Sequence, residues 1–241
     1  MSGFIGEFFG TLVLIVLGVG CCAATNLKQT YATKQNWTFI CLSWGMAVTF
    51  GVYVAGMLGS QGHLNPAVTI GFALFGYFPW SQVLPYLAGQ FLGAFMGAVL
   101  VIIQYYPHFK ASHGAEEGNV VNIFATMPAI KNPVFNFLSE VIATGVFIFA
   151  LLNLGTFTTG LKPAIVGLLI MVIGLSLGST TGFALNPARD WAPRLAYTIL
   201  PIPGKSSAHW EYAWVPMLGP LAGGIIAAGL QFILQAMNFV K

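Results

Sequence analysis

The chain has 241 residues, of which 57% are hydrophobic and only 6% are charged, and its formal net charge is +3. Soluble proteins contain about 25% charged residues, so this composition and a mean hydropathy of +0.81 exclude an ordinary soluble domain. They indicate an integral membrane protein. The positive charges form no basic run, which argues against nucleic acid as a partner.

Six apolar segments are expected to cross the bilayer as helices. In chain order they are residues 5–24, 39–57, 81–106, 135–154, 163–178 and 213–239. Two further apolar pieces, 66–75 and 187–195, are too short, because a helical span needs about 20 residues. We predict that each of them is a re-entrant half-helix. The expected fold class is therefore an all-α integral membrane protein.

The two halves of the chain carry matching residues in the same order. The pairs are Glu7 with Glu140, the box Asn65-Pro66-Ala67 with Asn186-Pro187-Ala188, and residues 89–93 with 219–223. Each half, about 1–106 and 134–241, holds three spans, and loop 107–133 joins them. Because three is an odd number, the halves enter the membrane from opposite sides. The sequence thus predicts one channel domain built from two inverted repeats.

The two Asn-Pro-Ala boxes mark the starts of the short helices, because Asn is a favoured N-cap and Pro a favoured first helical residue. A single Asn would be interpreted as capping its own helix. Two half-helices from opposite faces, however, meet N-terminus to N-terminus, where irregular backbone is tolerated only inside protein or along a wet cavity. We therefore predict a pore midpoint at both boxes. Its residues are Asn65, Pro66, Ala67, Asn186, Pro187 and Ala188.

With these features in place, the chain resembles the major intrinsic protein family, the aquaporins and glycerol facilitators, over essentially its whole length. Arg189 directly follows the second box, as in nearly all members, and Asp190 comes next, where water-selective members usually have a small residue. Asp190 therefore serves as a marker of the glycerol-facilitator subfamily of bacterial type. Other residues similar to that subfamily are Arg194, Pro220, Leu221 and, more loosely, Tyr105. Ser179-Thr180 departs from the pattern, which has a Pro nearby.

The resemblance implies the aquaporin fold, with six transmembrane helices and two re-entrant half-helices, assembled as a homotetramer with one pore in each protomer. It implies a narrow selectivity filter at Trp44, Gly174, Phe183 and Arg189. It implies a path of backbone carbonyls at Gly62, His63, Leu64, Ala184 and Leu185. It also implies that Glu7 and Glu140 accept hydrogen bonds from the backbone of the two turns.

The expected function is passive conduction of glycerol, water and other small neutral solutes, with ions and protons excluded. Urea, dihydroxyacetone, hydrogen peroxide and lactic acid are further candidate solutes, and no cofactor or metal is required. Trp44 and Phe183 would face the carbons of glycerol, Arg189 would donate to its hydroxyls, and Gly174 would leave the passage wide. Two helix N-termini, with about half a positive charge each, would repel cations.

The resemblance also implies a multi-pass protein of the plasma membrane, in contact with lipid and with both termini in the cytoplasm. The distribution of lysines opposes this orientation. Lys162 and Lys241 would lie inside, whereas Lys28, Lys34, Lys110, Lys131 and Lys205 would lie outside, contrary to the positive-inside rule.

The main alternative is a secondary transporter, because inverted repeats and broken helices also serve that class. Glu7 and Glu140 would then be candidates for proton coupling. An enzyme is disfavoured, since the spans contain no nucleophile–base pair or metal-ligand cluster. The cluster His113, Glu116 and Glu117 in loop 107–133 is interpreted as solvated. His63 is interpreted as a hydrogen bonder of its turn, with pH gating left open.

Overall fold

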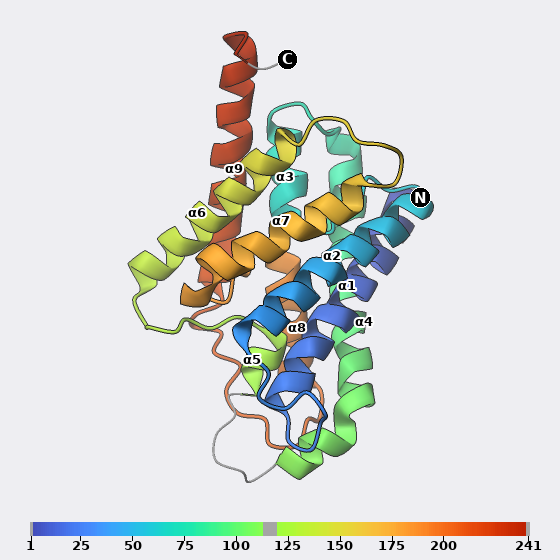
Figure 1. The fold of residues 1–241 in the computed structure, drawn as a ribbon, viewed down its shortest axis with the longest axis vertical. Coiled ribbons are helices and arrows are strands. Elements are labelled where there is room, and N and C mark those ends of the chain that lie inside the picture. Colours follow the sequence, from blue (N-terminus) through green and yellow to red (C-terminus); the bar gives the residue numbers. More distant parts are fainter. Residues whose placement is uncertain (1, 113–119, 240–241) are drawn as a thin grey trace.

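The computed structural model describes residues 2–112 and 120–239, and helix is the only regular secondary structure in this part of the chain (Figure 1). The helices are α1 Ser2–Asn26, α2 Trp37–Met57, α3 Pro66–Leu74, α4 Trp80–Ser112, α5 Val121–Phe124, α6 Pro133–Leu152, α7 Lys162–Leu177, α8 Pro187–Ile199 and α9 Trp214–Ala236. A short 3₁₀ turn, Gly178–Thr180, continues α7.

Six of these helices, α1, α2, α4, α6, α7 and α9, are long and apolar enough to cross a membrane. The six predicted spans are thereby confirmed, each with its ends within a few residues except at α4. Large apolar side chains on the outer faces are exposed, such as Leu84, Ile103 and Ile226, whereas Glu7 and Glu140 are fully buried. This distribution suits a bundle whose outer faces contact the hydrocarbon of the membrane and whose interior holds the polar side chains.

The prediction of a loop over residues 107–133 is wrong at two places, because residues 107–112 and 121–124 are helical. Helix α4 continues through Pro107 to Ser112 because its last turn is tied to the loop after α1. The backbone N–H of Lys28 donates to Ser112 Oγ at 2.9 Å. Further on, residues 121–124 form the buried helix α5. Residues 113–119, with the cluster His113, Glu116 and Glu117, lie outside the described residues.

The short helices α3 and α8 begin at Pro66 and Pro187, as predicted from their caps. Helix α3 ends at Leu74, one residue before the predicted end, and α8 continues to Ile199, four residues beyond it. The extension of α8 follows from side chains that support its second half. Arg194 pairs with Asp190 one turn earlier, and Thr198 Oγ1 donates to the carbonyl of Arg194 at 2.8 Å.

Each short helix packs on a long helix of the other half of the chain, α3 on α9 and α8 on α4. Helices α2 and α7 cross between the halves at Gly45 and Gly167. A Cβ on Gly45 would lie 2.6 Å from the carbonyl oxygen of Gly167, and a Cβ on Gly167 would lie 2.5 Å from that of Gly45. Only glycine allows the two backbones to approach this closely.

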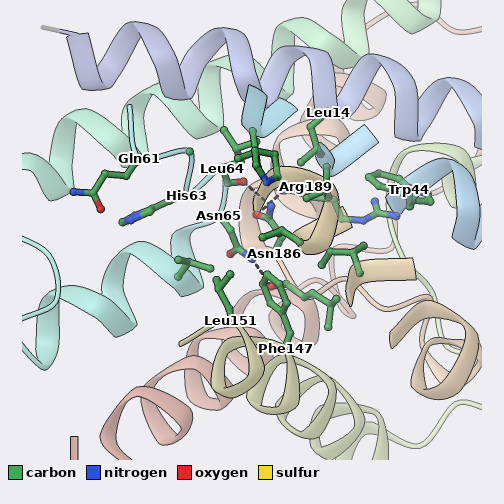
Figure 2. Close-up of a pocket in the computed structure, with 18 of the residues that line it drawn as sticks. Leu14, Trp44, Gln61, His63, Leu64, Asn65, Phe147, Leu151, Asn186 and Arg189 are labelled. Carbon is green, nitrogen blue, oxygen red and sulfur yellow. Dashed lines mark hydrogen bonds between the residues drawn. The ribbon is translucent and has the colours of Figure 1, made fainter. Parts of the chain in front are cut away.

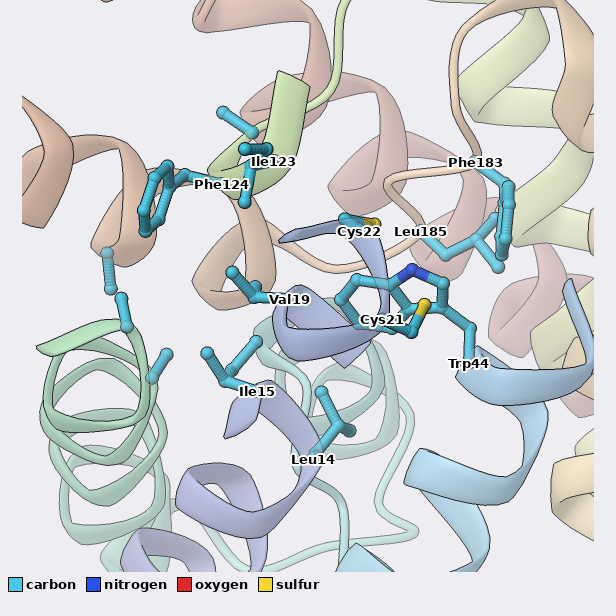
Figure 3. Packing of buried hydrophobic residues seen from close by; sticks show 14 of the residues in the cluster. Leu14, Ile15, Val19, Cys21, Cys22, Trp44, Ile123, Phe124, Phe183 and Leu185 are labelled. Carbon is cyan, nitrogen blue, oxygen red and sulfur yellow. The ribbon is translucent and has the colours of Figure 1, made fainter. Parts of the chain in front are cut away.

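The start of α1 and the end of α9 lie at the same end of the bundle, and α5 lies at the opposite end (Figure 1). The buried cluster at the α5 end joins Val19 of α1, Trp44 of α2, Phe124 of α5 and Phe183 (Figure 3). The three cysteines, Cys21, Cys22 and Cys41, are free thiols and buried.

Candidate pore and selectivity site

A cavity of about 450 Å³ lies between the two halves, and both box asparagines line it. Gln61 and His63 lie at one end of the row of lining residues, Trp44 lies at the other, and Asn65 and Asn186 lie between them (Figure 2). All five residues of the expected carbonyl path also line it: Gly62, His63, Leu64, Ala184 and Leu185.

The first turn is held by Glu7 of α1. The backbone N–H of His63 donates to Glu7 Oε1 at 2.9 Å, and that of Leu64 donates to Oε2 at 2.6 Å. Ser60 Oγ and Gln90 Nε2 donate to the same carboxylate. A buried carboxylate that accepts several hydrogen bonds gives partners to backbone N–H groups that would otherwise be left without one.

The second turn is held in the same way by Glu140 of α6. Thr181 Oγ1 and the backbone N–H of Ala184 donate to Glu140 Oε1 at 2.7 and 3.0 Å. The backbone N–H of Leu185 donates to Oε2 at 3.0 Å. The structure therefore brings both acids to the turns on which the resemblance had placed them.

Leu64 and Leu185 occupy the left-handed backbone region, with φ of 52° and 54°. Side chains other than glycine rarely adopt this conformation, and it persists where surrounding contacts over-determine it. Here those contacts are the bonds to the two carboxylates and two bonds between the turns. Asn186 Nδ2 donates to Leu64 O at 2.7 Å, and Asn65 Nδ2 donates to Leu185 O at 2.8 Å (Figure 2).

Each box asparagine also caps its own helix. Asn65 Oδ1 accepts from the N–H of Ala67 at 2.8 Å, and Asn186 Oδ1 accepts from Ala188 at 3.0 Å. The capping and pore interpretations of the asparagines are therefore compatible. An amide NH₂ has two N–H donors, and the crossing bond uses one, so the second can donate to a solute in the cavity.

At the Trp44 end, the Arg189 guanidinium carbon lies 4.0 Å from the centre of the Trp44 ring. Within residues 2–112 and 120–239 the ion pairs are Arg194–Asp190 and His209–Glu211, so no carboxylate pairs with Arg189. Its hydrogen bond to Phe124 O is long, at 3.5 Å. Since a guanidinium has five N–H donors, most of them are left for a ligand.

Gly174 lies beside the Phe183 ring and is not among the residues that line the cavity. A Cβ at this position would lie 3.0 Å from Phe183 Cζ and 2.9 Å from Cys41 Sγ. The glycine therefore makes room for the Phe183 ring, which does line the cavity.

Asp190 follows Arg189 but faces away from the cavity and is fully buried. Its Oδ1 accepts from Arg194 Nε at 2.8 Å, and its Oδ2 accepts from Thr126 N and Oγ1 at 2.7 and 2.8 Å. Arg194 Nη1 in turn donates to Ala208 O at 2.6 Å. Asp190 thus fixes α8 to the segments that follow α5 and α8, and it is not among the residues that line the cavity.

His63 lines the cavity at the other end, inside a group of aromatic rings. Its ring centre lies 4.6 Å from that of Phe78 and 5.1 Å from that of Tyr86, and its Nδ1 lies 3.1 Å from Thr69 Oγ1. A charged imidazolium would be poorly solvated there. This packing favours the interpretation of His63 as a hydrogen bonder of its turn.

Several residues that hold the two turns and α8 in place were not predicted from the sequence. Ser60 and Thr181 each stand five residues before a box asparagine, so superposing the two repeats residue by residue could have found them. Gln90 and Thr126 have no such signal, because each reaches its carboxylate from a distant segment. In the described part of the chain, no three His, Cys, Asp or Glu side chains lie close enough to hold a metal ion.

Comparison with known proteins agrees with this geometry. The family model described as Major intrinsic protein matches residues 1–231. Glycerol uptake facilitator protein 2 of Lactiplantibacillus plantarum is 74% identical over 98% of this chain and 100% of the relative. Glycerol uptake facilitator protein 3 of the same organism is 49% identical over 95% of each chain.

Among solved structures, the aquaglyceroporin from Plasmodium falciparum superposes with a TM-score of 0.86 at 31% identity. The superposition covers 99% of both chains, so it includes both re-entrant turns as well as the six spans. Sequence, site geometry and fold agree, and the chain belongs to the major intrinsic protein family.

Proposed function

We propose that this protein is a passive membrane channel that conducts glycerol, with water and other small neutral solutes, and excludes ions and protons. The observation that carries the proposal is the end of the cavity at Trp44 and Phe183, where no carboxylate of the described residues pairs with the Arg189 guanidinium. The names of the relatives, glycerol uptake facilitators, support the same solute.

A polyol has an apolar carbon face and a polar hydroxyl face, and the filter offers both kinds of contact. Phe183 presents an aromatic surface to the carbons, and Arg189 donates to the hydroxyl oxygens. At the midpoint, the second N–H of Asn65 and of Asn186 donates to a passing oxygen. The loss of hydration is offset in steps, so no single site holds the solute tightly.

Ion exclusion follows from the same groups. The N-termini of α3 and α8 face the midpoint and carry about half a positive charge each. The full charge of Arg189, which no carboxylate in the described residues neutralises, adds to this barrier at the filter. Cations and protons therefore meet two positive regions in series.

The proposal is tested by stopped-flow swelling of proteoliposomes with glycerol, water, urea and lactic acid. We expect glycerol uptake that stays linear with concentration and needs no ion gradient. Val68→Trp, at a buried position that lines the cavity, is expected to block uptake. Val172→Trp, at a position 48% exposed on α7, is the matched control and should leave it unchanged.

Uptake that saturates at low concentration, or that requires a gradient, would instead indicate a secondary transporter. The hydrogen bonding of Glu7 and Glu140 disfavours that alternative. Both carboxylates are fully buried and hold their turns through several bonds, so neither is free to carry a proton across.

The assembly is proposed to be a homotetramer in the plasma membrane with both termini in the cytoplasm. The start of α1 and the end of α9 lie at the same end of the bundle, which supports a common side for the termini (Figure 1). The lysine distribution opposes the cytoplasmic assignment, so reporter fusions at Lys241 should decide it. Light scattering of the detergent-solubilised protein measures the number of protomers.

A further inference from the structure

Trp37 is the first residue of α2 and follows the N-cap Asn36. Its indole Nε1 donates to the carbonyl oxygen of Gly174 at 3.0 Å. Its ring meets that of Phe183 edge to face, with centroids 5.5 Å apart and an interplanar angle of 83°. One side chain therefore contacts both the aromatic wall of the filter and the glycine that makes room for it.

Phe183 needs such support because its backbone is strained. Its φ of 38° is a left-handed value, which is unfavourable for an aromatic residue. On one side the ring lies against α7, where a Cβ on Gly174 would be 3.0 Å from its Cζ and a Cβ on Gly178 would be 2.4 Å from its Cδ1. Trp37 makes a further contact, and Phe183 is only 4% exposed.

We propose that Trp37 is a positioning residue of the filter, which holds the Phe183 ring against α7 and thereby sets the largest solute that passes. Trp37 does not itself line the cavity, so it acts through Phe183. The inference rests on the proposed channel function. Trp37 would thus be a fifth residue of the filter, one that contacts it from outside the passage. The other four are Trp44, Gly174, Phe183 and Arg189.

The bond between Trp37 and Gly174 also explains why one residue can control the geometry. It joins the start of α2 to α7, and these two helices meet again at Gly45 and Gly167. The Phe183 ring is held between this bonded pair and the 3₁₀ turn. Without the indole, the strained Phe183 backbone gains room to relax, and the ring can swing away from α7.

The test compares uptake of glycerol with that of a linear four-carbon polyol in proteoliposomes. Trp37→Phe keeps an aromatic ring and loses the N–H, and we expect the four-carbon to glycerol ratio to rise about three-fold. Trp37→Ala loses both contacts, and we expect about a ten-fold rise. Trp191→Phe is the matched control, because Trp191, like Trp37, donates to a backbone carbonyl, that of Ala213 at 2.7 Å, and does not line the cavity. Its ring packs against Trp210 instead of Phe183.

A merely structural role is separated from positioning by combining Trp37→Ala with Phe183→Leu. If Trp37 acts through Phe183, the double variant should have the ratio of Phe183→Leu alone. The proposal is overturned if Trp37→Phe and Trp191→Phe both have the four-carbon to glycerol ratio of the wild type. It is also overturned if the change in this ratio in the double variant is the full product of the changes caused by Trp37→Ala and by Phe183→Leu. Trp37→Phe suffices where Trp37→Ala does not fold.

The outcome also distinguishes this inference from the proposed function. A wild-type protein that fails to conduct glycerol would overturn the channel proposal, and the role of Trp37 with it. A conducting wild type whose ratio responds to Phe183→Leu but not to changes at Trp37 would overturn the positioning role alone.

Discussion

The two re-entrant turns, residues 60–69 and 181–190, share one construction. Each is held by a carboxylate from the first helix of its half, each has a leucine with positive φ before the box, and each sends an asparagine N–H to the other turn. These shared features build the midpoint of the cavity. The hydrogen bonds on the two sides of the midpoint therefore correspond to one another.

The turns differ in the side chains that they send toward the two ends. At the position of Arg189 the first turn has Val68, and at the position of Phe183 it has Gly62. The long helices α2 and α7 also differ at corresponding positions. When Gly45 of α2 is matched with Gly167 of α7, Trp44 corresponds to Val166 and Val52 corresponds to Gly174.

At these positions one end of the cavity therefore carries Trp44, Phe183 and Arg189, whereas the corresponding residues of the other half are glycine and three valines, Val52, Val68 and Val166. We therefore infer that the repeated features make a passage and the unrepeated ones make a filter.

The largest effect is expected from Glu140→Ala, which removes a shared feature. Three buried donors, on Thr181, Ala184 and Leu185, lose their acceptor, at a total cost of about 5 kcal/mol. Glu7→Ala should cost at least as much, because Glu7 accepts from four groups. The thermal stability of the detergent-solubilised protein measures both.

Glu211→Ala is the control, since Glu211 is an exposed acid outside the turns. If Glu140→Ala kept the thermal stability of the wild type, the carboxylate would not support the turn, and the shared construction would lose its physical basis.

The next effect concerns a feature of the second turn only. Asp190→Ala leaves Arg194 buried without its partner, which should cost about 3–5 kcal/mol. The corresponding change in the first turn, Thr69→Ala, removes a hydroxyl that bonds to Asn65 O, Gln90 and His63, at a cost of about 1–2 kcal/mol. Equal losses of thermal stability for the two variants would refute the asymmetry.

The sequence predicted the spans and the half-helices because apolar length and Asn-Pro capping are local signals. It could not predict the contacts that shape the filter. Whether Arg189 stacks on Trp44, and whether Gly174 faces the passage or the Phe183 ring, depends on helix rotation and rotamers. Trp37 and Gly174 are separated by 137 residues, and no repeat or spacing connects them.

A smaller effect, on selectivity rather than stability, is expected from Arg189→Val, which gives the second turn the residue of the first. Losing hydrogen bonds from a charged donor should change the ratio of glycerol to water uptake by about ten-fold. The variant should also admit protons, as measured with a pH-sensitive dye inside proteoliposomes. Val68→Ile, at the corresponding position of the first turn, is the control. Unchanged proton tightness would refute the exclusion role of Arg189.

The smallest effect is expected at Gln90, which gives the carboxylate of the first turn one hydrogen-bond donor more than that of the second turn has. Gln90 donates to Glu7 Oε2 at 2.7 Å and to Thr69 Oγ1 at 2.9 Å, whereas its counterpart in the other half is Pro220, which has no side-chain donor. Gln90→Met removes both bonds but leaves Glu7 three donors, as many as Glu140 has.

We therefore expect Gln90→Met to cost only about 1–2 kcal/mol, to lower thermal stability slightly, and to leave the ratio of glycerol to water uptake unchanged. Gln82→Met, on the exposed first turn of α4, controls for the substitution itself. A large change in that ratio would mean that the first turn also discriminates between solutes, and the division between a repeated passage and an unrepeated filter would fail.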